Sequence, residues 1–138
     1  MVDYAIKLRD EAEYLYDQVW CVFDKDDFSD FDDAISYAYK QGLHVAYSNE
    51  AFELWYLLHY DYLISALHRG QYQNILSDRL GRKYKKNDPT IYDDILDKQN
   101  MAIQNAKKLM DFFNSSSPSK SNPSTTVYKL VIELNKFM

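Results

Sequence analysis

The feature that most constrains the fold is a short apolar run that ends abruptly in acidic residues. Residues 19–23 read Val-Trp-Cys-Val-Phe, and Asp24, Lys25, Asp26 and Asp27 follow at once. Five consecutive apolar residues, two of them β-branched and two aromatic, are too few for a buried helix and too continuous for a half-exposed strand. The run therefore predicts a strand buried on both faces, as in a parallel sheet covered by helices.

The acidic residues after this strand have the spacing of a metal site. Asp24 and Asp26 form a D-x-D pair, and residues two apart in extended backbone project to the same side. Carboxylate oxygens on one side of the chain are ligands that a divalent cation prefers. We therefore predict that Asp24, Asp26 and Asp27 hold Mg²⁺ or Mn²⁺.

Composition indicates one globular domain. The 138 residues are 46% hydrophobic and 16% aromatic, which is enough for a real core, so we treat 1–138 as a single domain. The net charge of −5 argues against broad coating of nucleic acid, but it allows a local basic groove. Cys21, the only cysteine, is interpreted as a small core residue of a protein in the reducing cytoplasm. No apolar run reaches the roughly 18 residues of a membrane span. We expect a cytoplasmic protein without membrane contact.

The pattern of apolar residues predicts an α/β fold in which a small parallel sheet is flanked by helices and most residues are helical. Residues 43–47 are short and apolar and predict a second strand. The serine-rich segment 114–121 has the composition of a mobile linker before a C-terminal helix. Helices are predicted over 3–17, from Ser29 to Gly42, over about 49–68, 71–80 and 90–113, and after Asn122-Pro123.

The strand-helix-strand order brings two loops together. A crossover of this length makes the two strands parallel, so their carboxyl ends emerge at one edge of the sheet. Ser48, Asn49 and Glu50 follow the second strand and are expected beside the acidic loop, where open parallel sheets bind ligands. Glu50 and Glu53, one turn apart, are candidate catalytic bases. The alternative is that Glu50 opposes the helix dipole and Glu53 is a solvated or salt-bridged acid.

Two further patterns have both a functional and a structural explanation. The segment 79–86 is the only dense basic stretch, and it surrounds an aromatic residue, so it is a candidate for binding phosphates and stacking a base. A solvated surface loop is the alternative. His59 lies among aromatic residues, where a hydrogen-bonded core histidine is the alternative to a ligand. The candidate nucleic-acid-binding residues are Arg79, Arg82, Lys83, Lys85 and Lys86.

Four ordered blocks together resemble one family. The blocks Val19–Phe28, Ala46–Tyr60, Ala102–Ala106 and Asn122–Val127 resemble the RloB-like proteins of bacterial defence loci. The resemblance implies a variant of the Toprim fold, in which a glutamate and a D-x-D follow two strands and serve Mg²⁺-dependent phosphodiester chemistry. It assigns the D-x-D to Asp24 and Asp26. The residues that match the second and last blocks, and are expected to support the site, are Ser48, Asn49, Glu53, His59, Asn122 and Thr125.

The chain departs from this pattern at its start. Family members usually begin with a strand that leads into a Glu-Gly turn, whereas this sequence contains no Glu-Gly pair and begins inside the following helix. The chain is then a shortened product, or Glu50 or Glu53 replaces the missing glutamate, or the chemistry is absent. Two parallel strands alone form a thin sheet with a bare edge. We predict that another chain, as in a homo-oligomer, or one of its own helices covers that edge.

These patterns favour a Mg²⁺-dependent nuclease that hydrolyses DNA or RNA in defence against phage. A first alternative is a catalytically incomplete binding or regulatory module that partners an ATPase or a sister subunit. A second is a haloacid-dehalogenase-like phosphotransferase, which also has D-x-D after a buried strand but requires Thr or Val where Phe28 stands. A third is a plain scaffold whose acids only cap helices and face solvent.

Overall fold

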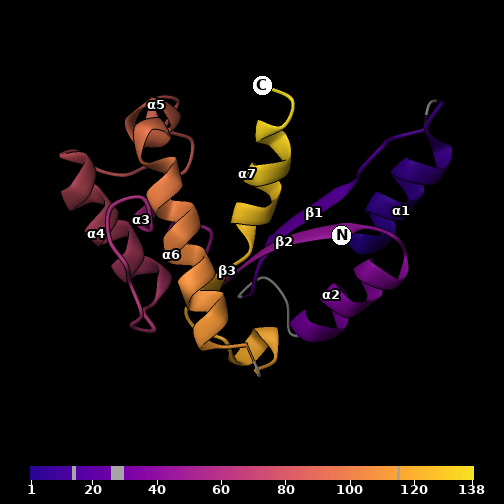
Figure 1. The fold of residues 1–138 in the computed structure, drawn as a ribbon, viewed down its shortest axis with the longest axis horizontal. Coiled ribbons are helices and arrows are strands. Elements are labelled where there is room, and N and C mark those ends of the chain that lie inside the picture. Colours follow the sequence, from indigo (N-terminus) through magenta and orange to yellow (C-terminus); the bar gives the residue numbers. More distant parts are fainter. Residues whose placement is uncertain (14, 26–29, 115) are drawn as a thin grey trace.

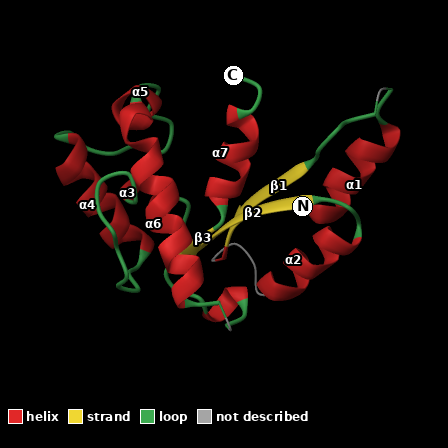
Figure 2. Cartoon of the chain, in the orientation of Figure 1, coloured by secondary structure: helices red, strands yellow, loops and turns green. Residues whose placement is uncertain are grey.

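The computed structural model describes residues 1–13, 15–25, 30–114 and 116–138. Asp26, Asp27, Phe28 and Ser29 lie outside these ranges, so two of the three predicted metal ligands and the predicted start of the second helix are not described. The elements, shown in Figures 1 and 2, are α1 (Val2–Glu11), β1 (Trp20–Asp24), α2 (Phe31–Lys40), β2 (His44–Asn49), α3 (Glu53–Leu57), α4 (Arg69–Leu80), α5 (Ile91–Ile95), η2 (Leu96–Lys98), α6 (Gln99–Phe112), η3 (Pro118–Lys120), β3 (Ser124–Thr125) and α7 (Val127–Asn135).

The sheet has the order β1-β2-β3, and β1 and β2 are parallel, as predicted. Their register pairs Trp20 with His44 and Asp24 with Ser48. The two-residue strand β3, which the sequence did not indicate, runs antiparallel to β2 and pairs Ser48 with Thr125. The small α/β sheet flanked by helices is therefore confirmed, with one short strand added.

Two apolar clusters pack on opposite faces of the sheet. Side chains alternate between the two faces along β1, and Cys21 and Phe23 lie on the face opposite to Trp20. On that face they pack with Val45 and Tyr47 of β2 against α1 and α2. The larger cluster lies over the other face and contains side chains of α3 to α7, and Figure 1 shows these helices on the side away from α1 and α2. The prediction that the first strand is buried on both faces is wrong, because β1 forms an edge and Val22 is 39% exposed. β2 is the strand buried from Val45 to Asn49.

The helices flanking β1 and β2 differ from prediction in their extent. α2 ends as predicted, because Gly42 adopts φ 78° and the Leu43 amide donates to the Ala38 carbonyl at 3.0 Å. α1 stops at Glu11 rather than near residue 17. It packs through Val2, with Ala5 and Ile6 beside it. Apolar residues at helical spacing in 3–17, which an amphipathic helix would bury, are instead exposed, as Tyr4 (65%), Leu8 (50%) and Leu15 (100%) show.

The predicted long helix over 49–68 is wrong. α3 covers only Glu53–Leu57, a turn follows, and regular helix resumes at Arg69. Leu57 and Leu58 are fully buried, and the Leu58 carbonyl accepts a hydrogen bond at 2.8 Å from the Asn105 side chain of α6. A contact from another helix thus satisfies a carbonyl just past the end of α3.

The C-terminal third contains two further corrections. The predicted helix over 90–113 is divided into α5, η2 and α6, and the last helix begins at Val127, after β3, rather than after Asn122-Pro123. The mobility of 114–121 stays a prediction, but this segment contains η3 and makes specific contacts. The Ser119 amide and hydroxyl donate to Asp32 of α2 at 2.8 and 2.6 Å. Among the described residues, no helix is both long enough and apolar enough to cross a bilayer.

Candidate functional site

The carboxyl ends of β1 and β2 bring several predicted site residues to one place. Asp24, the last residue of β1, lies opposite Ser48 in the parallel register, and Glu50 follows two residues later. The Ser48 hydroxyl lies 2.8 Å from the Thr125 hydroxyl of β3. The edge predicted from the strand-helix-strand order therefore exists, and β3 joins it.

The neutral residues at this edge hold the strands together. Ser48, Asn49 and Thr125 are buried, and the Asn49 amide donates to the carbonyls of Pro118 and Ser119 at 3.0 and 3.1 Å. These bonds fasten the end of β2 to η3. The Oδ1 atom of Asn122 is buried and accepts no hydrogen bond within the described part of the chain.

An arginine that the sequence did not indicate contacts the first aspartate. Arg69 Nη2 lies 2.9 Å from Asp24 Oδ2, and the two side chains are only 28% and 14% exposed. Arg69 is the first residue of α4, where the helix dipole favours a negative charge such as that of Asp24. Arg69 and the start of α4 thus neutralise one carboxylate of the predicted metal site.

The two glutamates lie on the same side as this ion pair. Glu50 Oε2 is 3.6 Å from His68 Nδ1, directly before Arg69. Glu53 is 3% exposed, and Gln73 Nε2 of α4 lies 3.4 Å from its Oε1. The structure therefore places both glutamates against residues 68–73, the same segment whose Arg69 contacts Asp24.

The carboxylates also affect two buried tyrosines, of which Tyr72 was not singled out from the sequence and Tyr84 was expected to stack on a base. Burial raises the pKa of Tyr84, and the negative charges of Glu53 and Asp24 raise it further. Burial also raises the pKa of Tyr72 to about 12, to which the charge of Glu50 contributes. The phenol of Tyr84 is thus affected by carboxylates from the end of β1 and from the start of α3.

A complete cation site is not formed by the described residues alone. No group of three or more His, Cys, Asp or Glu side chains among them is arranged to hold a metal ion. Asp24 is the one described member of the predicted triad, since Asp26 and Asp27 fall in the gap at 26–29. The donors at this edge are carboxylate oxygens, the type that Mg²⁺ and Mn²⁺ prefer.

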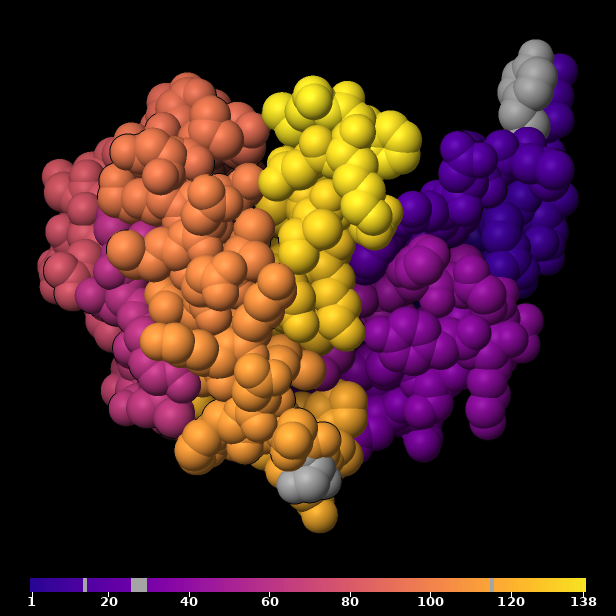
Figure 3. All heavy atoms as spheres, viewed as in Figure 1, coloured from indigo at the N-terminus to yellow at the C-terminus, as the bar shows by residue number. Residues whose placement is uncertain are grey.

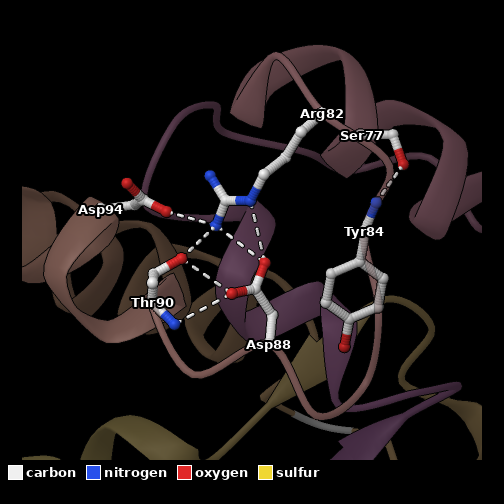
Figure 4. A network of polar contacts seen from close by, with 6 residues as sticks. All are labelled: Ser77, Arg82, Tyr84, Asp88, Thr90 and Asp94. Carbon is white, nitrogen blue, oxygen red and sulfur yellow. Dashed lines mark hydrogen bonds and ion pairs between the residues drawn. The ribbon is translucent and has the colours of Figure 1, made fainter.

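The arginines of the basic segment 79–86 form ion pairs within the chain. Figure 4 shows Arg82 donating to Asp88 at 2.8 and 2.9 Å and to Asp94 at 2.6 Å. Hydrogen bonds from Thr90, followed by that from Arg82, lower the pKa of Asp88 to about 2. Arg79 is similarly 2.8 Å from Asp61. Both arginines predicted to bind nucleic acid are thus paired with acids of the same chain.

The lysines of this segment are placed differently. Lys83, Lys85 and Lys86 are exposed, whereas Tyr84 between them is buried and cannot stack on a base in this conformation. The amide of Tyr84 donates to Ser77 Oγ at 2.8 Å, which returns the chain over α4 (Figure 4). The three lysines are therefore solvent-exposed neighbours of a buried tyrosine whose pKa the charges of Glu53 and Asp24 raise.

His59 has the surroundings of a core residue. It is 1% exposed, its Nδ1 lies 2.9 Å from the Trp55 carbonyl oxygen, and its ring contacts the Trp55 ring edge to face at 4.9 Å. Burial lowers its pKa, and the positive charge of Lys98 acts in the same direction.

We expect this histidine to make the fold sensitive to acid. Because the pKa of His59 is lower in the folded protein than its usual 6.5, the unfolded chain binds the proton more readily below that pH. Stability should be full above pH 6.5 and should fall below it, by at most about 1.4 kcal/mol per pH unit from this group. Urea unfolding of the protein and of His59→Gln at pH 7.5 and 5.5 measures the difference. An equal loss in both proteins would exclude His59 as the cause.

Comparison with known proteins identifies the family. No curated protein and no solved structure matches the chain significantly. The family model described as RloB-like protein matches residues 1–134, which is nearly the whole chain. The chain therefore belongs to the RloB-like family.

Proposed function

We propose that this protein hydrolyses phosphodiester bonds of nucleic acid with Mg²⁺ or Mn²⁺ and acts in defence against phage. The observation that carries the proposal is the parallel register that sets Asp24 opposite Ser48, two residues before Glu50. Parallel sheets bind ligands at this edge. Membership of the RloB-like family adds support.

In this proposal each residue at the carboxyl ends of β1 and β2 has a separate role. Asp24, with Asp26 of the D-x-D pair, would hold the cation, which when bound neutralises phosphate oxygens and lowers the pKa of an attacking water. Glu50, which is 28% exposed, would accept the proton from that water. The exposed side chains of Lys83, Lys85 and Lys86 would attract the phosphates of the nucleic-acid backbone.

The ion pair with Arg69 sets a condition on this mechanism. Arg69 is close to Oδ2 of Asp24 at 2.9 Å, so a cation would have to share that carboxylate or displace the guanidinium. A displaced arginine would be well suited to a phosphate, because its planar group binds two oxygens at once. Arg69 would then release Asp24 and bind a phosphate of the substrate.

Binding of the metal can be tested without any assay of activity. A cation at ten times its dissociation constant should stabilise the folded protein by about 1.4 kcal/mol and raise the melting midpoint by about 5 °C. We expect this shift with Mg²⁺ or Mn²⁺ in the natural protein and its loss in Asp24→Asn. Asp33→Asn on the exposed first turn of α2 is the matched control and should keep the shift. No shift in the natural protein would reject the metal site.

The reaction itself is tested by incubating the protein with DNA, RNA and transfer RNA, each with Mg²⁺, with Mn²⁺ and with a chelator. The proposal expects cleavage of at least one substrate with metal and none with the chelator. Cleavage that persists in the chelator would contradict it.

A second candidate is a binding or regulatory module without catalysis, which partners an ATPase or a sister subunit. One observation favours it: the contact of Arg69 with Asp24, which occupies a carboxylate of the predicted metal site. This candidate predicts that Lys83, Lys85 and Lys86 bind nucleic acid or a partner. It also predicts that metal does not shift the melting midpoint and that no substrate is cut. The two experiments above therefore separate the two functions.

A further inference from the structure

The loop 81–90 between α4 and α5, which we call the lysine loop, contains no helix or strand, yet its first half is fixed by hydrogen bonds and packing. The Arg82 amide donates to the Ser77 carbonyl at 3.3 Å, just past the end of α4. The Tyr84 amide donates to Ser77 Oγ at 2.8 Å, and the Tyr84 ring is buried in the larger apolar cluster. The start of the loop is therefore held against α4 and the core.

One side chain closes the lysine loop across its two ends. The guanidinium of Arg82 donates to Asp88 through Nε and Nη2 at 2.9 and 2.8 Å (Figure 4). Its Nη2 also donates to the Thr90 hydroxyl at 2.9 Å and to Asp94 of α5 at 2.6 Å. Asp88 in turn accepts bonds from the amide and the hydroxyl of Thr90 at 2.9 and 2.8 Å. Arg82 thus ties the beginning of the loop to its end and to the next helix.

This network leaves three positive charges of the loop without a counter-charge. Lys83, Lys85 and Lys86 are exposed, and none of them forms an ion pair with another residue in the described ranges. Figure 3 shows the segment between α4 and α5, coloured between rose and orange, at the surface and on the side away from the indigo N-terminal segment. A lysine ammonium is a compact charge that suits a phosphate oxygen, whereas the guanidinium of Arg82 already binds carboxylates.

We propose that Arg82 is a positioning residue, which holds the lysine loop in the shape in which its three lysines meet the phosphates of nucleic acid, and does not itself contact a phosphate. This role, which rests on the nucleic-acid binding of the proposed function, differs from the phosphate contact predicted for Arg82 from the sequence. A loop that is ordered before binding loses less conformational freedom on binding, so its affinity is higher. Because Tyr84 is buried, the loop contacts phosphates rather than stacked bases.

Contact and positioning differ in how binding depends on salt. Each basic residue that neutralises a phosphate of a duplex adds about 0.9 to the fall of log affinity with log salt concentration, so the three lysines give a slope of about −2.7. A residue that only positions the loop contributes nothing to this slope. Its loss therefore weakens binding by the same factor at every salt concentration.

The affinity for a short fluorescent DNA duplex, measured in a chelator from about 50 to about 200 mM potassium chloride, tests the proposal. The double variant Arg82→Gln/Asp94→Asn removes one charge of each sign, so the net charge of the network is unchanged. We expect it to bind about tenfold more weakly with the natural slope. Lys83→Gln should instead reduce the slope by about 0.9, so its loss of affinity should shrink about 3.5-fold over this range.

A second ion pair provides the matched control. Glu133 and Lys136 of α7 lie 2.8 Å apart, and Glu133→Gln/Lys136→Gln also leaves the net charge unchanged, so this variant should bind like the natural protein. A slope reduced by about 0.9 in Arg82→Gln/Asp94→Asn would make Arg82 a phosphate contact, and an unchanged affinity would make its bonds dispensable. Either result, or a natural protein that does not bind the duplex, would overturn the proposal. Binding without cleavage in metal would reject only the proposed hydrolysis.

Thr90→Val tests the positioning role without changing any charge. It removes the hydroxyl that accepts from Arg82 and donates to Asp88, while the side chain keeps its shape. We expect weaker binding at the natural slope, together with faster amide hydrogen exchange across the lysine loop. Melting midpoints close to that of the natural protein would show that the variants are folded. An affinity that does not fall, or that falls without faster exchange, would overturn the proposal.

Discussion

Metal-dependent cleavage by Asp24→Asn is expected to be at least about 100-fold slower than cleavage by the natural protein, a loss of about 2.7 kcal/mol in transition-state stabilisation. Asparagine keeps the size of the side chain but removes the negative charge that would hold the cation. Asp24 is the described member of the D-x-D pair and lies opposite Ser48 at the strand ends. Steady-state rates at saturating Mg²⁺, with the nucleic acid that the cleavage experiment identifies as substrate, measure the effect.

The control must separate chemistry from folding, because Asp24→Asn also weakens the contact with Arg69. Arg69 remains partly exposed at 28%, so we expect that change to cost only about 1 kcal/mol of stability. Asp33→Asn removes an exposed carboxylate on α2 and should cleave at the natural rate. If the folded Asp24→Asn variant cleaves within about threefold of the natural rate, the Asp24 carboxylate is not a metal ligand.

The position of Asp24 could be predicted because it depends on local signals. An apolar run followed by acid marks the end of β1, and Gly42 supplies the left-handed residue that ends α2 before β2. A crossover of that length favours parallel strands, which brings the carboxyl ends of β1 and β2 to one edge, and there the structure pairs Asp24 with Ser48. Each step needs residues close in sequence.

Arg69 and Tyr84 could not be found in this way. A buried carboxylate such as Asp24 requires a counter-charge, but sequence does not say which of 16 basic residues provides it. Arg69 is 45 residues from Asp24, and packing of α4 against α3 decides the pairing. Tyr84 looked like an exposed base-stacking residue because charged neighbours surround it, yet its ring completes the core beside Tyr56.

The apolar pattern in 49–68 predicted burial better than it predicted the length of the helix. The pattern that predicted a helix through His59 is satisfied by a helix of five residues and a buried turn, since Leu57 and Leu58 are buried on both sides of the helix end. The stripe on α1 has helical spacing but lies at the surface, where Tyr4 and Leu8 border the open strand.

Truncating Leu54 in α3 should lower the free energy of unfolding by about 3 kcal/mol and the melting midpoint by about 10 °C. Leu54 is fully buried in the larger cluster, with Tyr72 and Leu76 of α4 in the same cluster. Leu54→Ala removes buried methyl groups, and the neighbouring helices can only partly close the space. Urea unfolding monitored by tryptophan fluorescence measures the loss.

Leu96→Ala is the control, because a 47% exposed leucine should cost less than about 0.5 kcal/mol. A loss below about 1 kcal/mol for Leu54→Ala would mean that α3 is not packed as described. The comparison also bears on the site, since Leu54 follows Glu53 directly and the same short helix carries both. If α3 positions Glu53 against α4, Leu54→Ala should weaken the metal-induced melting shift as well, whereas Leu96→Ala should preserve it.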